Sequence, residues 1–133
     1  MAYLIKASLG EILDKLSILE IKLSYAKEES QIKNIKNEFD HLSEIAAPLW
    51  DKGKGELKDL YAQLKSINHE LWAIEDDIRL KEAGKEFGEE FVSLARSVYI
   101  TNDKRAETKR DINKCLDSEF FEEKIYSNPD YAQ

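Results

Sequence analysis

The chain has 133 residues, of which 42% are hydrophobic and 35% are charged, and its formal net charge is −7. A chain of this size can fold as one domain without disulfides or a metal. The negative charge argues against nucleic acid and anionic membranes as partners, since both are bound through clusters of Lys and Arg. Cys115 is the single cysteine, so no intramolecular disulfide can form, and we expect a cytoplasmic protein.

The N-terminal residues 1–8 are expected to be extended and to precede the first helix. Ser8 and Glu11 form a capping box, in which the Ser hydroxyl and the Glu carboxylate each bind a backbone amide that the helix leaves unpaired. The first helix should therefore begin at about Leu9.

Apolar residues recur at intervals of three and four positions after this start. The spacing predicts one continuous helix over residues 9–46. A break at residues 28–30, with Ser30 capping a second helix, is the alternative. Pro48 should end the helix, because proline disrupts a helix interior, and residues 47–55 should form a loop.

Two further long helices are predicted, over residues 56–83 and 89–116. The first carries an unbroken apolar stripe, and Gly84 suits the position just past its end. The connection over residues 85–88 is short, so the two helices should be antiparallel neighbours.

The C-terminal residues 119–126 have the pattern of a short amphipathic helical turn, and residues 127–133 should form a flexible tail. Residues 1–133 are therefore predicted to form a single domain. Its fold class is all-α: an elongated antiparallel bundle of three long helices, the first either continuous or broken into two, with coiled-coil-like packing.

The apolar stripe of the last helix is interrupted by polar residues. It runs from Phe91 to Ile112, and between them the same register contains Asn102, Arg105 and Lys109. Burying such groups without partners costs about several kcal/mol, so another group must meet them.

The preceding helix carries a second stripe that is a candidate counterpart. Asn68, Trp72, Glu75 and Arg79 follow one another at spacings of four, three and four, and so share one helix face. An antiparallel pairing about Gly84 brings this face near the interrupted stripe. A polar layer between the two helices is therefore expected.

Two interpretations of the polar layer remain open. In the first, it binds an anion: the two cations hold a carboxylate or phosphate, the amides add hydrogen bonds, Trp72 forms an apolar wall and Glu75 acts as a base or orienting group. In the second, acidic side chains of the chain itself satisfy the cations. The candidate anion-binding residues are Asn68, Trp72, Glu75, Arg79, Asn102, Arg105 and Lys109.

No metal site and no cofactor is predicted. Glu11 and Asp14 are three residues apart on the first helix, but such pairs arise by chance among 27 acidic residues. His41 and His69 lie beside the apolar stripes and are expected at the surface.

Three strings carry a resemblance to a small all-helical bacterial family of unknown function. They are GEILDKLSILEIK (residues 10–22), NHELWAIEDDIR (residues 68–79) and LARSVYITNDKRAETKRDIN (residues 94–113). The resemblance implies a helical fold but no activity, so it supplies no catalytic residues.

The leading functional hypothesis is a helical module that binds a second copy of itself or another protein. Long helices, sustained apolar stripes and the aromatics Trp50, Tyr61 and Tyr99, expected at the surface, favour it. The alternative is a binding site or enzyme for an anionic metabolite held between the two C-terminal long helices.

Overall fold

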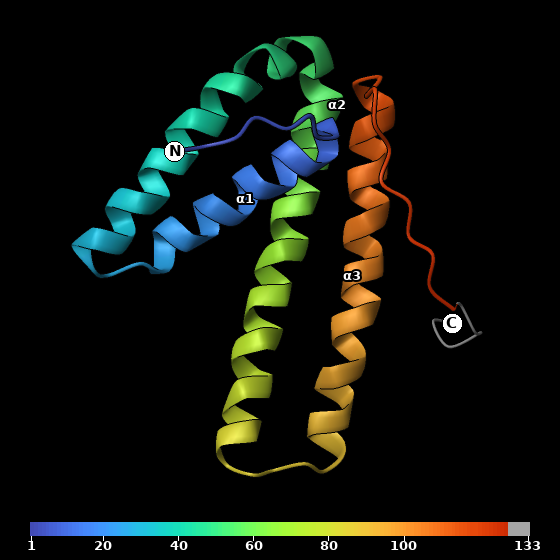
Figure 1. The fold of residues 1–133 in the computed structure, drawn as a ribbon. Helices are drawn as coiled ribbons and strands as arrows, with labels where there is room; N and C mark the ends of the chain where they lie inside the picture. The colour runs from blue at the N-terminus through green and yellow to red at the C-terminus, as the bar shows by residue number, and fades with distance from the viewer. Residues whose placement is uncertain (128–133) are drawn as a thin grey trace.

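Two helical hairpins joined by a sharp bend make up the computed structural model, which describes residues 1–127 (Figure 1). The helices are α1 (Leu9–Tyr25), α2 (Glu29–Ala83) and α3 (Glu89–Cys115), and residues 1–127 contain no strand. The predicted all-helical bundle is confirmed. None of the helices in this described range is both long and apolar enough to cross a membrane.

The prediction of one continuous helix over residues 9–46 is wrong. The chain is broken over residues 26–28, as the alternative expected, although Ser30 lies inside the second helix and does not cap it. Because the chain turns back here, Phe39 and Leu42 pack against the same core as α1. A straight helix would carry these side chains away from that core.

The next reversal of the chain occurs at Lys54 and not at Pro48. Pro48 lies inside α2, so most of the predicted loop over residues 47–55 is helical, and Lys54 interrupts the helix with φ 52° and ψ −140°. At the buried Gly53, a Cβ atom would lie 2.4 Å from the Cβ atom of Leu57. Glycine is therefore required where the backbone bends this tightly.

The second half of α2 and the helix α3 have the predicted lengths and form an antiparallel hairpin (Figure 1). Gly84 caps α2 with helical angles, and Lys85 adopts the left-handed conformation, φ 54°, one residue later than predicted. The Glu86 N–H donates to the Lys81 carbonyl at 2.9 Å, which completes a Schellman-type helix end.

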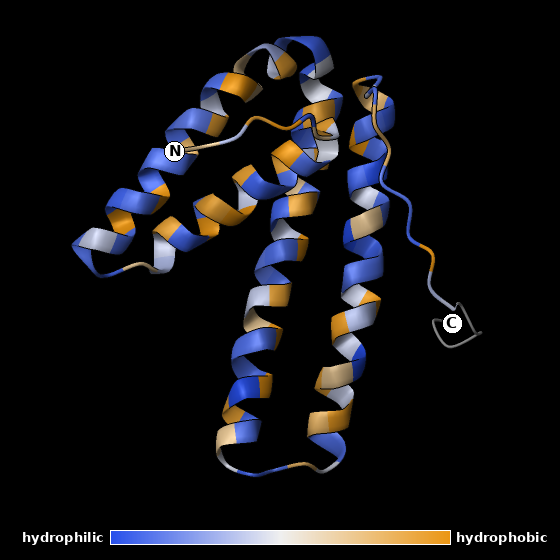
Figure 2. Ribbon diagram, viewed as in Figure 1, coloured by the Kyte–Doolittle hydropathy of each residue, from blue (hydrophilic) through white to orange (hydrophobic). Residues whose placement is uncertain are grey.

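The apolar core lies where α1, the bend of α2 and the C-terminal end of α3 meet. Its buried residues are Leu13, Leu16, Ala46, Leu57, Leu64, Ile112 and Leu116. Beyond this core α2 and α3 continue as a two-helix hairpin, along which apolar residues recur on both helices (Figure 2).

Trp50 and Tyr61 belong to the edge of this core, so the expectation that they are surface aromatics is wrong. Their rings meet edge to face at 5.0 Å, and the Tyr61 hydroxyl donates to Glu20 of α1 at 2.6 Å. Burial, with the bond to Glu20, raises the pKa of Tyr61, so its hydroxyl stays a donor. Tyr99, in contrast, is exposed as predicted.

Residues 119–127 run back along α3 without helical structure, so the predicted helical turn over residues 119–126 is wrong (Figure 1). Glu122, Glu123 and Lys124 each form an ion pair with α3. A segment without helical structure spans more of the length of α3 than a helix of the same number of residues does. Of the predicted flexible tail, residues 128–133 lie outside the described residues.

Replacing Gly10 with alanine tests how closely α1 approaches α3. A Cβ atom at Gly10 would lie 2.4 Å from the backbone carbonyl oxygen of Lys109, and the Gly10 N–H donates to Asn113 at 2.6 Å. We expect Gly10→Ala to lower the free energy of unfolding in urea by about 1–3 kcal/mol. Gly55→Ala, where nothing lies within 4 Å of the added atom, should change it by less than about 1 kcal/mol. Equal losses would contradict the close approach.

Candidate functional site

A buried carboxylate, Asp14 of α1, lies at the centre of the polar layer. Its side chain is 1% exposed. Arg105 of α3 donates to both carboxylate oxygens, from Nε at 3.0 Å and from Nη2 at 2.5 Å. Asn68 of α2 donates to Oδ1 at 2.9 Å. One carboxylate therefore connects all three helices through a bidentate ion pair and an amide.

The position of Asp14 follows from a stripe along α1. Gly10, Asp14, Ser17 and Ile21 are spaced by four, three and four residues, and all four are buried. The Ser17 hydroxyl donates to the Asp14 carbonyl at 2.7 Å and accepts from Asn68 at 2.8 Å. Over residues 1–127, no buried side-chain nitrogen or oxygen lacks a hydrogen-bond partner. The layer is thus closed on itself.

Lys109 lies one turn beyond Arg105 and is also met by carboxylates. Its Nζ atom lies 2.6 Å from Glu11, 2.9 Å from Glu122 and 3.9 Å from Asp14. The Glu11 N–H donates to the Ser8 hydroxyl as the capping box predicted, but the Glu11 carboxylate binds Lys109 instead of completing the box. Lys109 therefore links α1, α3 and residues 119–127, which we call the C-terminal segment.

The surroundings keep both cations charged at neutral pH. The hydrogen bond to Asp14 is the main cause of the raised pKa of Arg105. Burial lowers the pKa of Lys109, but the hydrogen bonds to Glu11 and Glu122 and the nearby charges outweigh it, and the net shift is upward. Two cations face three carboxylates, so the cluster is electrostatically satisfied.

Of the predicted site residues, Asn68, Arg105 and Lys109 come together here. Asn102 is at the edge of the cluster, where its Oδ1 atom accepts from Arg105 at 3.5 Å. Glu75 and Arg79 are exposed and pair with each other at 3.3 Å. The counter-charges of the layer therefore come from α1 and the C-terminal segment, and not from the predicted stripe of α2.

Trp72 lies away from the cations in an aromatic stack. Its ring is stacked on Tyr25 at 5.0 Å, and Tyr25 is stacked on His69 at 6.0 Å. The Tyr25 hydroxyl and the Nε2 atom of His69 are 3.1 Å apart. This stack fixes the C-terminal end of α1 on α2. His41 and His69 are exposed, as predicted.

The sequence patterns assigned none of the three carboxylates to the cluster, since Glu11 was expected only in the capping box. Asp14 was detectable, because its stripe with Gly10 and Ser17 has the same spacing as the apolar stripe beside it. Glu122 carried no such signal, because its segment has no regular structure and its position depends on charges of α3.

A groove of about 1270 Å³ lies between α3 and the C-terminal segment. Asn102 and Arg105 form part of its wall, so the cluster borders the groove. The remaining residues that line it are Val98, Tyr99, Asp103, Ala106, Glu107, Arg110, Glu122, Glu123, Lys124, Tyr126 and Ser127. No group of three or more His, Cys, Asp or Glu side chains within residues 1–127 is placed to hold a metal ion.

Comparison with known families identifies the chain. It belongs to a family of unknown function, DUF6165, and the match covers residues 4–132. The resemblance to a helical family of unknown function is therefore confirmed. No curated protein and no solved structure matches the chain.

The interaction between Asp14 and Arg105 can be measured with a double-mutant cycle. Asp14→Leu leaves a partly buried cation without its partner, and we expect it to lower the free energy of unfolding by about 3–5 kcal/mol. The double variant Asp14→Leu with Arg105→Met should lose less than the sum of its single changes, because it leaves no unpaired charge. At the exposed pair, Glu75→Ala should cost less than about 1 kcal/mol. Additive losses in the cycle would argue against a coupled pair.

The contact between Glu122 and Lys109 should weaken in acid. The hydrogen bond from Lys109 lowers the pKa of Glu122 below its ordinary value of 4.5. A lowered pKa stabilises the folded state above pH 4.5, and this contribution is lost as the pH falls through the folded-state pKa. Carboxyl-carbon NMR of Glu122 should show this low pKa, and Lys109→Gln should raise it. Lys104→Gln, an exposed cation of the same helix, should not; an equal effect of both changes would count against the contact.

Proposed function

We propose that this member of the family is a non-catalytic helical module that self-associates through the far end of its second hairpin. We call this end, residues 75–96, the hairpin tip. The proposal rests on the observation that the tip consists of two helices and a turn with exposed apolar side chains. Leu80 is 69% exposed, Phe87 54% and Val92 44%.

Packing rules support the use of the tip as an interface. Between its two helices Ile78 and Leu94 are half-buried, so the tip has a thin apolar seam of its own. Two helices alone cannot cover both sides of such a seam, and helix bundles usually do so with a third or fourth helix. A second hairpin supplies both missing helices at once.

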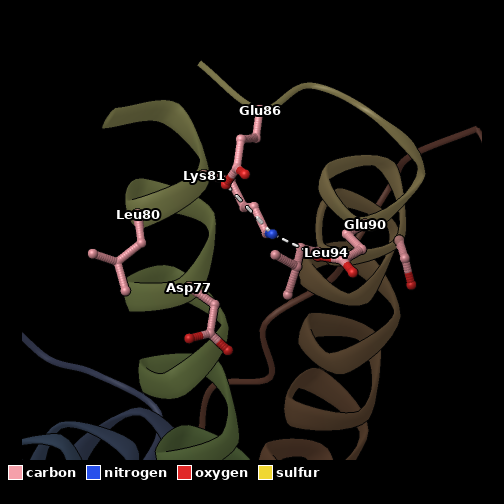
Figure 3. Close-up of a pocket in the computed structure, with 7 residues that line it drawn as sticks. Asp77, Leu80, Lys81, Glu86, Glu90 and Leu94 are labelled. Carbon is pink, nitrogen blue, oxygen red and sulfur yellow. Dashed lines mark ion pairs between the residues drawn. The ribbon is translucent and has the colours of Figure 1, made fainter. Parts of the chain in front are cut away.

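A pocket of about 500 Å³ on one side of the tip fits this proposal (Figure 3). Leu80 and Leu94 give it apolar walls. Lys81 extends between the helices, with its Nζ atom 3.6 Å from Glu86 and 2.5 Å from Glu90. The pocket offers a recess for an apolar side chain, bordered by the paired charges of Lys81, Glu86 and Glu90 and by Asp77.

The distribution of charge favours a second copy in the opposite direction. Residues 75–96 contain seven acidic and four basic residues, whereas residues 97–114 of α3 contain three acidic and five basic ones. Two tips at the same end would repel each other. A two-fold arrangement of antiparallel hairpins places each acidic tip near this part of its partner, where Lys104 and Lys114 are exposed and lie outside the polar cluster.

The alternative of an anionic metabolite in the polar strip has less support. The three carboxylates around Arg105 and Lys109 already meet the charge that such a ligand would supply. A cytoplasmic location forms part of the proposal, and the lone Cys115 is compatible with a reducing compartment.

Sedimentation and light scattering over a range of concentrations test the association. We expect wild-type mass to rise from one chain to two, and Leu80→Asp to weaken association at least about tenfold, because a buried leucine contributes about 1.5–3 kcal/mol. Leu4→Asp is the matched control, since Leu4 is exposed on the N-terminal segment. Salt at about 1 M, where the Debye length is about 3 Å, should also weaken association.

Three results would contradict the proposal. The wild-type chain could keep the mass of one chain at every concentration. Leu4→Asp could weaken association as much as Leu80→Asp. Association could strengthen in salt, which would indicate that like charges, and not opposite ones, lie together.

A further inference from the structure

The C-terminal segment, residues 119–127, lies along α3 without helical structure and contacts it through side chains, as a bound peptide would. We propose that this face of α3 is a docking site for an acidic, extended peptide with aromatic residues, and that the segment occupies the site in the free chain. The partner is a protein that carries such a peptide and displaces the segment. This inference does not rest on self-association through the hairpin tip.

The contacts of the segment define the ligand chemistry. Glu122 binds Lys109 at 2.9 Å, and Glu123 binds Arg110 at 3.1 Å. The Arg110 guanidinium also lies over the ring of Phe121, 5.6 Å from its centroid. Adjacent cations of α3 therefore select adjacent carboxylates, and one of them selects an aromatic ring beside these carboxylates.

The segment is held by charge with little burial. Every one of residues 119–127 is exposed, and Phe120 and Phe121 remain 43% and 39% exposed. Exposed ion pairs contribute little free energy each. The segment therefore covers α3 without being part of the core, and a competing peptide displaces it without unfolding the helices.

Lys109 gives the site a built-in position for one carboxylate. It is 7% exposed, and Glu11 and Asp14 hold it from the side of α1. Glu122 supplies the carboxylate on the opposite side and belongs to the exposed segment. Removal of the segment leaves a fixed cation on this face of α3, where an incoming carboxylate can bind.

The test uses the full chain and a labelled peptide with the sequence of residues 119–127. In a released variant the internal segment is weakened by Phe121→Ser, Glu122→Gln and Glu123→Gln. Fluorescence anisotropy should show that this variant binds the peptide at least about tenfold more tightly than the wild-type chain. The wild-type segment competes at an effective concentration of about millimolar, as short tethers do.

Matched controls separate docking from general charge effects. A variant with Glu28→Gln and Glu29→Gln loses the same two charges at the start of α2, and its affinity should equal that of wild type. Arg110→Gln in the released variant should weaken binding, whereas Lys104→Gln should not. In the peptide, Glu122→Gln should weaken binding more than Glu119→Gln, because Glu122 pairs with Lys109 of α3 whereas Glu119 pairs with Lys6 of the N-terminal residues.

The wild-type chain provides a second measurement that does not depend on the folding of any variant. Peptide at about millimolar concentration should displace the internal segment, so that the NMR signals of Tyr126 move towards those of the free peptide. The proposal is overturned if the released variant binds no more tightly than wild type, or if these signals do not move. Stabilisation of the released variant by inorganic phosphate, without peptide binding, would also overturn it in favour of a small-anion site.

Discussion

The bidentate pair between Asp14 and Arg105 is the interaction on which the rest of the structure depends. Removing a carboxylate from water is costly, and the cost is offset only when the partner groups are held in good geometry. Here Arg105 and Asn68 provide this geometry from two helices. The pair therefore fixes the register of α1 against the second hairpin. Apolar side chains alone would define this register less strictly.

The close packing around this pair follows from the small residues beside it. Gly10 lets α1 approach the backbone of α3, and the Asn113 side chain accepts a hydrogen bond from the Gly10 N–H. Ser17 satisfies Asn68 on the other side. The strip that breaks the apolar stripe of α3 is thus matched by a strip of small and polar residues on α1. This complementarity favours one packing arrangement of α1 on α3, although it reduces the apolar area that the core buries.

The sequence was most predictive where a regular stripe decides the structure. The helices over residues 56–83 and 89–116 follow from such stripes, because each helix keeps one apolar face along its length. Periodicity did not reveal the break at residues 26–28, since both halves of the stripe pack on the same core after the chain turns back. Pro48 was misleading for a related reason. Packing of the neighbouring Trp50 against the core keeps the helix intact up to the bend at Lys54.

The polar cluster joins residues that are far apart in the sequence, and this has a consequence for biosynthesis. Arg105, Lys109 and Asn113, the partners of α1, lie 91 to 103 positions later in the chain. When α1 leaves the ribosome, its buried carboxylate has no partner yet, and it must wait until most of the chain has emerged. The contacts within the second hairpin are closer in sequence, so they can form earlier than those with α1. Docking of α1 is therefore a late step of folding, and its apolar stripe stays exposed until then.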